Sequence, residues 1–444
     1  MASSTTKSQQ YRALGLSTFS FTLCFAVWTI FSIIGLKIAE DLDLSNTQLG
    51  LLMATPILTG SISRLFLGIW TDRYGGRWVF GVLMLTTSAC VYLLTLATTY
   101  PMLLVGALGV GLAGGSFIVG VAYTSAWFDA KQQGTALGIF GAGNVGAAVT
   151  NFGAPFLLVA FGWEDTARIY AMVLASMGVF FVLFAKDDPL TAARRGGDQQ
   201  SFLEQMAPLR ELRVWRFALY YFFVFGAFVA LALWLPHFLM GVYGLDIKTA
   251  GIIAALYTIP ASLFRILGGW MSDRFGARRV MYWTFIASVI CTFLLSYPPT
   301  DYVVQGIDGD IRFSIAMSLP VFVALIFVLG FFMSLGKAAV YKHVPVYYPE
   351  HVGAVGGVVG MIGGLGGFAL PLAFGVLNDL TGIWQSCFML MFGIVAAALM
   401  WMHYAVRSAE REEWAADQEQ TDLPELASPQ LFYPLNRKLP SRKS

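Results

Sequence analysis

The chain has 444 residues, of which 57% are hydrophobic and 12% charged, and its mean hydropathy is +0.67. Because soluble domains carry about 25% charged residues, this composition excludes an ordinary soluble protein and predicts an all-α polytopic membrane protein in a lipid bilayer. The net charge of +2 gives no indication of a nucleic-acid partner.

Twelve apolar stretches are long enough to cross a bilayer as helices, which takes about 20 residues. They fall into two sets of six, separated by a polar stretch. The first set is 16–39, 48–70, 78–98, 101–125, 135–160 and 166–185, and the second is 215–240, 249–271, 280–297, 316–342, 352–377 and 383–406.

This pattern predicts a chain of two pseudo-symmetric six-helix halves. Residues 1–185 form the N-terminal half, 186–214 a cytoplasmic linker and 215–406 the C-terminal half. The charged, proline-containing residues 407–444 are predicted to be a disordered cytoplasmic tail.

Basic residues gather in the loops on one predicted side of the membrane. Arg73, Arg77 and Lys131 follow even-numbered segments, whereas the opposite loops carry acids such as Glu40 and Asp165. Since cytoplasmic loops are enriched in lysine and arginine, both termini are predicted to be cytoplasmic.

Two arginines occupy matching positions inside apolar segments of the two halves. Arg64 and Arg265 lie in GSISRLFLGIWTDRYGGR and ASLFRILGGWMSDRFGAR, which are offset by 201 residues. Each arginine is roughly 12 Å along a helix from the Asp-Arg pair that follows it. A guanidinium at that depth costs at least ~2.5 kcal/mol. An ion pair with an acid would offset this cost, but no Asp or Glu lies in the middle of any segment. The pair therefore predicts a small anion held between the halves.

The two Asp-Arg loops share a second pattern. GIWTDRYGGR and GGWMSDRFGAR fit G-x-x-x-D-R-x-G-x-R, and the chain resembles the major facilitator superfamily over its full length. The resemblance implies twelve transmembrane helices and a site at the interface of the halves. It implies a conformational latch at Asp72, Arg73, Asp273 and Arg274. The alternative is that these loops are basic turns that only set topology.

Segments five and eleven are unusually rich in glycine. They contain GTALGIFGAGNVGAAVTNFGAP and GAVGGVVGMIGGLGGFALPLAFG. Small residues let membrane helices approach closely, so packing alone accounts for most of these glycines. Asn144 is a polar exception, either an interhelical hydrogen-bonding group or an amide donor to a bound anion.

These two strings and the arginine pair resemble the nitrate/nitrite porter family. The resemblance implies nitrate, with nitrite as a second candidate, as the substrate. It also implies a bacterial inner-membrane location. By position, the implied binding residues are Arg64, Arg265, Asn144, Tyr221, Phe225 and Phe117. Guanidinium suits planar oxyanions because it is planar and offers its donors in a fork. Each aromatic residue is alternatively a packing or lipid-facing side chain.

Segment ten adds three candidate proton-coupling residues, Lys337, Lys342 and His343, in GKAAVYKHVPVYYP. This string resembles the proton-coupled members of the family. Lysine or histidine can gain or lose a proton when its surroundings change. Lys342 and His343 are alternatively part of the basic cytoplasmic edge, whereas Lys337 lies deeper.

The sequence predicts a nitrate uptake transporter that works by alternating access as a nitrate/proton symporter. The alternatives are a nitrate/nitrite antiporter with the same site, a carrier of another small anion such as a carboxylate, and an anion sensor that does not transport. An enzyme, a cofactor and a metal site are not expected. The chain has no metal-ligand cluster, nucleophile–base set or nucleotide fingerprint, and its four cysteines lie singly in apolar stretches.

Overall fold

The computed structural model describes residues 7–128, 130–187, 210–347 and 352–419. Within these ranges, nine helical spans are long and apolar enough to cross a membrane. The protein is therefore a multi-pass helical membrane protein, as the composition predicted. It divides into two compact units, residues 1–398 and 399–444, and everything discussed below as a site lies in the first.

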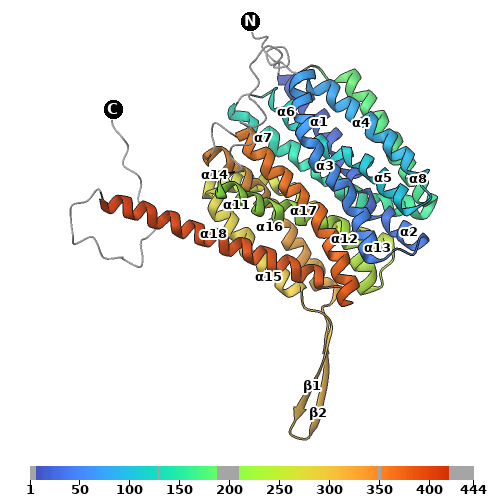
Figure 1. The fold of residues 1–444 in the computed structure, drawn as a ribbon, viewed down its shortest axis with the longest axis vertical. Helices are drawn as coiled ribbons and strands as arrows, with labels where there is room; N and C mark the ends of the chain where they lie inside the picture. Colours follow the sequence, from blue (N-terminus) through green and yellow to red (C-terminus); the bar gives the residue numbers. More distant parts are fainter. Residues whose placement is uncertain (1–6, 129, 188–209, 348–351, 420–444) are drawn as a thin grey trace. The chain divides into compact units, whose positions relative to one another are not determined.

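The helices of the N-terminal half follow the predicted segments closely (Figure 1). Their bounds are α1 Lys7–Trp28, η1 Ile30–Ser32, α2 Ile34–Asp41, α3 Asn46–Tyr74, α4 Gly76–Leu94, α5 Tyr100–Val110, η2 Gly111–Gly115, α6 Ser116–Ser125, α7 Ala130–Gly141, η3 Ala142–Val145 and α8 Gly146–Phe184.

Helices also cover the predicted segments of the C-terminal half. Their bounds are α11 Leu212–Tyr221, η5 Phe222–Ala227, α12 Phe228–Tyr243, α13 Ile247–Leu263, α14 Arg265–Phe275, α15 Ala277–Leu295, α16 Leu319–Tyr347, α17 Val352–Thr381 and α18 Ser386–Glu419. Most of the predicted linker, residues 188–209, lies outside the described residues.

The difference between twelve predicted segments and nine spans has a simple origin. Segments five and six form one helical span, Thr135–Phe184, which turns sharply at Gly162 with φ 81° and ψ 175°. The first two segments, 16–39 and 48–70, are helical without being among the nine. In the first of them the helix is interrupted after Trp28, where the Thr29 hydroxyl donates to the Phe25 carbonyl at 3.0 Å, a contact that often bends helices.

Residues 300–315 differ from the all-helical expectation. The stretch between the predicted segments 280–297 and 316–342 forms an antiparallel hairpin of β1 Thr300–Gly306 and β2 Gly309–Ile315 (Figure 1). Tyr302 pairs with Phe313 and Val304 with Ile311 in its register. These β-branched and aromatic pairs favour strands, and this signal was missed in the sequence.

The predicted start of the disordered tail is also corrected. α18 continues to Glu419, well past residue 407. The added residues, SAEREEWAADQE, are rich in alanine and glutamate, which are strong helix formers. Residues 420–444 lie outside the described part of the chain.

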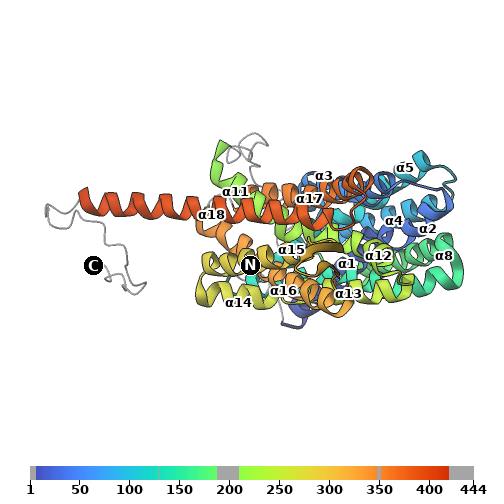
Figure 2. The same cartoon turned by 90° about the horizontal axis from the view of Figure 1, so that it is seen from below.

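The most extensive contacts between the halves are those of α3 with α17 and of α8 with α13 (Figure 2). Gly50 and Gly251, which are offset by 201 residues like the two arginines, allow these contacts. A Cβ on Gly50 would lie 2.4 Å from the Pro371 carbonyl oxygen, and one on Gly251 would lie 2.2 Å from that of Asn151. Real Cβ atoms do not approach so closely, so these glycines are what lets the halves meet.

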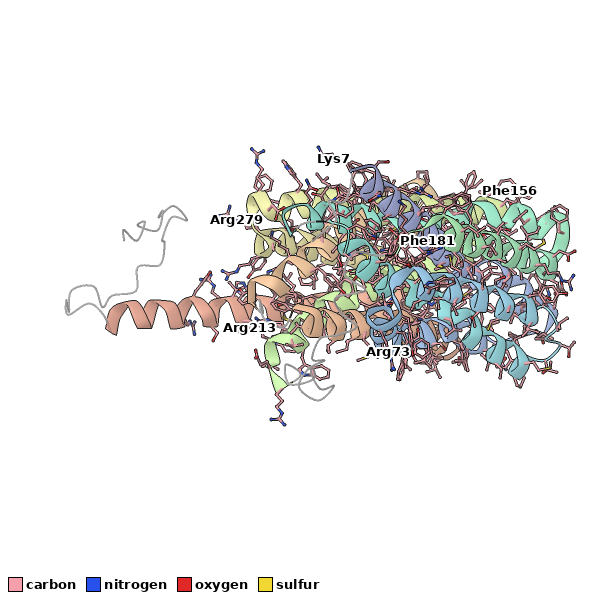
Figure 3. All side chains as sticks on the ribbon, turned by 90° about the horizontal axis from the view of Figure 1, so that it is seen from above. Lys7, Arg73, Phe156, Phe181, Arg213 and Arg279 are labelled. Carbon is pink, nitrogen blue, oxygen red and sulfur yellow. The ribbon has the colours of Figure 1, made fainter. Side chains whose placement is uncertain are left out.

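The side chains labelled in Figure 3 show the two ends of the bundle. Arg213 and Arg279 lie toward one end, and Phe156 lies toward the other (Figure 3).

Candidate functional site

The two matching arginines share one aromatic ring. The Cζ atom of Arg64 lies 5.6 Å from the centroid of Phe117, and that of Arg265 lies 5.8 Å from the same centroid. Both arginines are buried, each with 8% of its surface exposed. The fold therefore brings Arg64, Arg265 and Phe117 from the sequence prediction into one cluster, which we call the arginine site.

The two guanidinium groups have different hydrogen-bond partners. Arg64 donates from Nε to the Gly114 carbonyl at 3.3 Å and from Nη1 to the Gly360 carbonyl at 3.1 Å. Arg265 Nη1 has no acceptor among the described residues. Nor does either arginine pair with a carboxylate within those residues. A buried donor without an acceptor is costly, so the site favours an added acceptor such as an anion.

The glycine-rich segments make room for the arginines of the opposite half. A Cβ on Gly141, in the N-terminal half, would lie 3.2 Å from Arg265 Cζ and Nε. In the C-terminal half, Gly360 supplies the carbonyl that Arg64 contacts, and a Cβ on Gly364 would lie 3.5 Å from Arg64 Nη1. Close approach of helices alone does not explain these glycines, because they border the two guanidinium groups directly.

Breaks in helix geometry occur where site residues lie. Gly114 belongs to the 3₁₀ turn η2 and Asn144 to the 3₁₀ turn η3, while Phe225 lies in the π-helical turn η5. Arg265 directly follows the break between α13 and α14 at Phe264. Such local departures from α-helix are frequent at functional sites.

The predicted aromatic residues Tyr221 and Phe225 line the same cluster. Their rings stack at 5.1 Å and 8°, and Arg64 Cζ lies 5.7 Å from the Phe225 centroid. Two further aromatic residues were missed from the sequence. Trp28 has its ring 5.7 Å from Arg64 Cζ, and Tyr341 has its ring 5.8 Å from Arg265 Cζ.

The missed aromatics carried only weak signals. Tyr341 follows Lys337 by one helical turn, so both lie on one face of α16. That spacing could have indicated Tyr341. Trp28 had no such signal in the sequence.

Asn144 is fully buried, and neither its Nδ2 nor its Oδ1 atom has a hydrogen-bond partner within the described residues. Asn151 on the same predicted segment differs. It accepts from Ser32 Oγ at 2.8 Å and donates to the Ala232 carbonyl at 3.1 Å. Buried amides are normally paired, so the unpaired amide of Asn144 favours a ligand role over a packing role.

Lys337 is also fully buried and lies next to the arginine site. Its Nζ donates to the Ala261 carbonyl at 2.9 Å and lies 3.1 Å from the Phe228 centroid. The same Nζ is 5.9 Å from the centroid of Phe225, which Arg64 also contacts. The region thus holds three basic side chains, Arg64, Arg265 and Lys337.

The other two candidate proton-coupling residues lie elsewhere. Lys342 Nζ pairs with Asp273 Oδ1 at 2.5 Å, and both side chains are exposed. His343 packs against Phe217 and Tyr347, and its Nδ1 lies 2.7 Å from the Ala339 carbonyl oxygen. Among the described contacts, neither residue joins the arginine site.

The predicted latch residues lie at the helix ends. Asp273 pairs with Lys342 of the same half. Arg73 lies over the Tyr74 ring at 5.4 Å and Arg274 over the Trp270 ring at 5.4 Å. The side chain of Asp72 is outside the described part of the structure.

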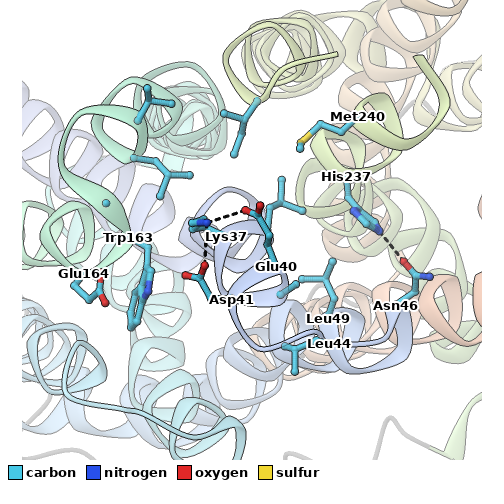
Figure 4. Close-up of a pocket in the computed structure, with 16 residues that line it drawn as sticks. Lys37, Glu40, Asp41, Leu44, Asn46, Leu49, Trp163, Glu164, His237 and Met240 are labelled. Carbon is cyan, nitrogen blue, oxygen red and sulfur yellow. Dashed lines mark hydrogen bonds and ion pairs between the residues drawn. The ribbon is translucent and has the colours of Figure 1, made fainter. Parts of the chain in front are cut away.

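At the opposite end, a pocket of about 760 Å³ lies between α2, α3, α8, α12 and α13 (Figure 4). Lys37 pairs there with Glu40 and Asp41, each at 2.9 Å. On the other side of the pocket, Asn46 Oδ1 lies 2.8 Å from His237 Nε2. Asn46 and Thr47, at the N-terminus of α3, also donate to the carboxylate of Asp379. These contacts tie the halves together at the predicted outer end.

Comparison with known proteins identifies the superfamily to which this fold belongs. The family model described as Major Facilitator Superfamily matches residues 16–301 and 243–438. The chain belongs to the major facilitator superfamily. Like other members of this superfamily, it is a transporter and not an enzyme.

Relatives within the superfamily narrow the assignment. The probable nitrate/nitrite antiporter NarK1 of Thermus thermophilus is 45% identical over 426 residues, covering 92% of this chain and 94% of the relative. The nitrite extrusion protein of Bacillus subtilis is 29% identical, covering 91% and 98%. The probable nitrate transporter NarT of Staphylococcus carnosus is 30% identical, covering 89% and 96%. The chain is thus a member of the nitrate/nitrite porter family.

Solved structures support the fold alone. The nucleoside transporter NupG, solved as a point mutant, has a TM-score of 0.68 and 17% identity, covering 89% of this chain and 99% of NupG. A bacterial homologue of the human lysosomal transporter Spinster has a TM-score of 0.67 and 16% identity, covering 90% and 98%.

Proposed function

We propose that this major facilitator protein takes up nitrate, with nitrite as a second substrate, by alternating access at the arginine site. The observation that carries the proposal is the position of Arg64 and Arg265, from opposite halves, on the same Phe117 ring. The names of the relatives favour nitrate over other small anions such as a carboxylate.

A bound nitrate would bridge the two halves. Its oxygens match the donors of Arg265, whose Nη1 has no acceptor among the described residues. Arg64 would contribute from the N-terminal half, and the amide of Asn144 would add a donor. The rings of Phe117 and Phe225 would cover the flat faces of the anion and exclude bulkier ones. Attraction between the anion and both arginines would draw the halves together, and separation at the cytoplasmic ends would release the anion.

Uptake against the membrane potential requires a second ion. Moving one negative charge inward costs ~2.3 kcal/mol per 100 mV. We propose that protons supply this energy and that Lys337 carries one of them. Lysine exchanges its proton far more readily than arginine, and Lys337 is buried beside the arginine site with a backbone carbonyl as its partner. A protonated Lys337 would strengthen anion binding, and loss of the proton would weaken it.

Exchange of nitrate for nitrite is the second candidate, favoured by the name of the Thermus relative. Exchange needs the same arginine site but no proton on Lys337. An anion sensor is less favoured, since the relatives above are named as transporters or as an extrusion protein. In each case we propose a place in the bacterial inner membrane with both termini cytoplasmic.

The test is nitrate entry into liposomes containing the protein, with an imposed inward proton gradient and with or without nitrite inside. Proton-driven entry into nitrite-free liposomes supports symport. Entry only with internal nitrite makes the protein an exchanger. Arg265→Lys should reduce entry by roughly 100-fold or more, because the loss of a charged fork at a buried site costs several kcal/mol. Absence of nitrate movement in every condition would refute the substrate assignment.

A further inference from the structure

Tyr341 connects the surroundings of the two arginines. Its ring lies 5.8 Å from Arg265 Cζ. Its hydroxyl lies next to Gly360, since a Cβ on Gly360 would be 2.7 Å from Tyr341 Oη. The carbonyl of that same glycine accepts from Arg64 Nη1. The Tyr341 side chain therefore extends from the guanidinium of Arg265 to the backbone of Gly360, whose carbonyl binds Arg64 of the N-terminal half.

Among the described residues, the hydroxyl of Tyr341 has two uncharged partners, the Gly356 carbonyl and the side chain of Tyr221. It donates to the Gly356 carbonyl at 3.3 Å, which is longer than the 2.5–3.0 Å typical of O–H···O hydrogen bonds. Exchanging an uncharged partner for a charged acceptor would gain a stronger hydrogen bond. The hydroxyl is thus a donor beside the arginine site whose partners among the described residues, Gly356 and Tyr221, carry no charge.

The ring of Tyr341 is fixed by its neighbours. It meets the Tyr221 ring edge to face at 4.9 Å and 85°, and Tyr221 stacks on Phe225. Gly356 and Gly360 on α17 leave the space that the ring and hydroxyl occupy. These contacts hold the hydroxyl near one position, which is what a specificity-determining group requires.

We propose that Tyr341 is a further anion-contacting residue that favours nitrate over nitrite. This inference rests on the proposed nitrate transport. Nitrate offers three oxygens and nitrite offers two. Two guanidinium forks can engage both oxygens of nitrite. The third oxygen of nitrate can accept from the Asn144 amide and still has a lone pair for a further donor. The Tyr341 hydroxyl leaves Gly356 and donates to that oxygen.

The matched variants are Tyr341→Phe and Tyr257→Phe. Tyr257 is a buried tyrosine of α13 whose hydroxyl contacts Met333 Sδ at 3.3 Å. In liposomes, Tyr341→Phe should lower kcat/KM for nitrate about tenfold or more while changing that for nitrite less than about threefold, because one charge-assisted hydrogen bond is lost only with nitrate. Tyr257→Phe should leave the nitrate-to-nitrite ratio unchanged.

Equal losses for both anions, or no change with either, would overturn the role of Tyr341 while leaving nitrate transport intact. A wild-type protein that moves neither anion would instead refute the proposed function, and the inference with it. Should Tyr341→Phe fail to fold, Tyr341→His keeps a flat ring with a donor and should retain part of the nitrate preference. If folded Tyr341→His and Tyr341→Leu have the same nitrate-to-nitrite ratio of kcat/KM, the inference is also overturned.

Discussion

Asp379 of α17 accepts two hydrogen bonds from Thr47 of α3, one from the backbone nitrogen at 2.7 Å and one from Oγ1 at 2.5 Å. Asn46 adds two more, from its backbone nitrogen at 3.2 Å and from Nδ2 at 2.9 Å. The carboxylate thus caps the N-terminus of a helix that belongs to the other half, where a negative charge is favourable. All four hydrogen bonds must break when these ends of the halves separate.

We therefore expect Asp379→Asn to increase opening at the predicted outer end, because the amide loses the charge and one acceptor oxygen. Met53 lies further along α3 and is fully buried. In a Met53→Cys background, labelling by a membrane-impermeant maleimide should be severalfold faster with Asp379→Asn. The same chain without Met53→Cys gives the background from the native cysteines.

Asp246→Asn is the matched control for this prediction. Asp246 caps α13 by accepting from the backbone nitrogens of Lys248 and Thr249, both in its own helix. Its loss affects a helix end without releasing the contact between halves. Equal labelling rates for the two variants would argue against a gating role for Asp379.

Asn144 and Asn151 should respond to alanine in opposite ways. Asn144→Ala removes an amide with no described partner, so the Tm should stay the same or rise. Its KM for nitrate should nevertheless increase about tenfold if the amide binds the anion. Asn151→Ala loses hydrogen bonds to Ser32 and Ala232 and should lower the Tm. Thermal unfolding in detergent and transport in liposomes measure the two effects. A similar drop in Tm for both variants would assign Asn144 to packing.

Lys337→Gln should make nitrate transport independent of the proton gradient. The glutamine amide can still donate to the Ala261 carbonyl but carries no exchangeable charge. We expect nitrate/nitrate exchange to persist while the stimulation by an inward proton gradient disappears. Lys342→Gln, on the same helix but paired with exposed Asp273, should keep that stimulation. Retained proton stimulation in Lys337→Gln would exclude this lysine as the coupling group.

Gly141→Ala tests the space beside Arg265. The added methyl would lie 3.2 Å from the guanidinium, which must then shift by a few tenths of an ångström. We expect the nitrate KM to rise severalfold. Gly138→Ala is the control, since no atom of the described residues beyond its own helix backbone lies within 4 Å of its Cβ position. Alanine favours the helix equally at both positions, so a difference in KM between the two variants reports on the site. Identical KM values would show that the guanidinium can shift without a loss of nitrate affinity.

The local patterns of the sequence accounted for most of the helices. Apolar stretches of spanning length follow from the cost of exposing backbone polar groups to lipid, and every predicted segment is helical in the structure. The hairpin at 300–315 was missed because a short strand pair outside the membrane depends on pairing between residues and not on hydropathy. The extension of α18 was missed because the charged composition of residues 408–419 suggested disorder, although its alanines and glutamates favour helix.

The sequence by itself determined that two arginines lie at matching depths in two repeated halves, because the repeat is local and the offset is constant. Only the tertiary structure decided that both guanidiniums share Phe117, that Gly141 borders Arg265 and Gly360 contacts Arg64, and that Tyr341 completes the cluster. These contacts join residues far apart in the chain across the two halves. They depend on how the helices pack and where α-helical geometry is interrupted, and neither property follows from local hydropathy or spacing.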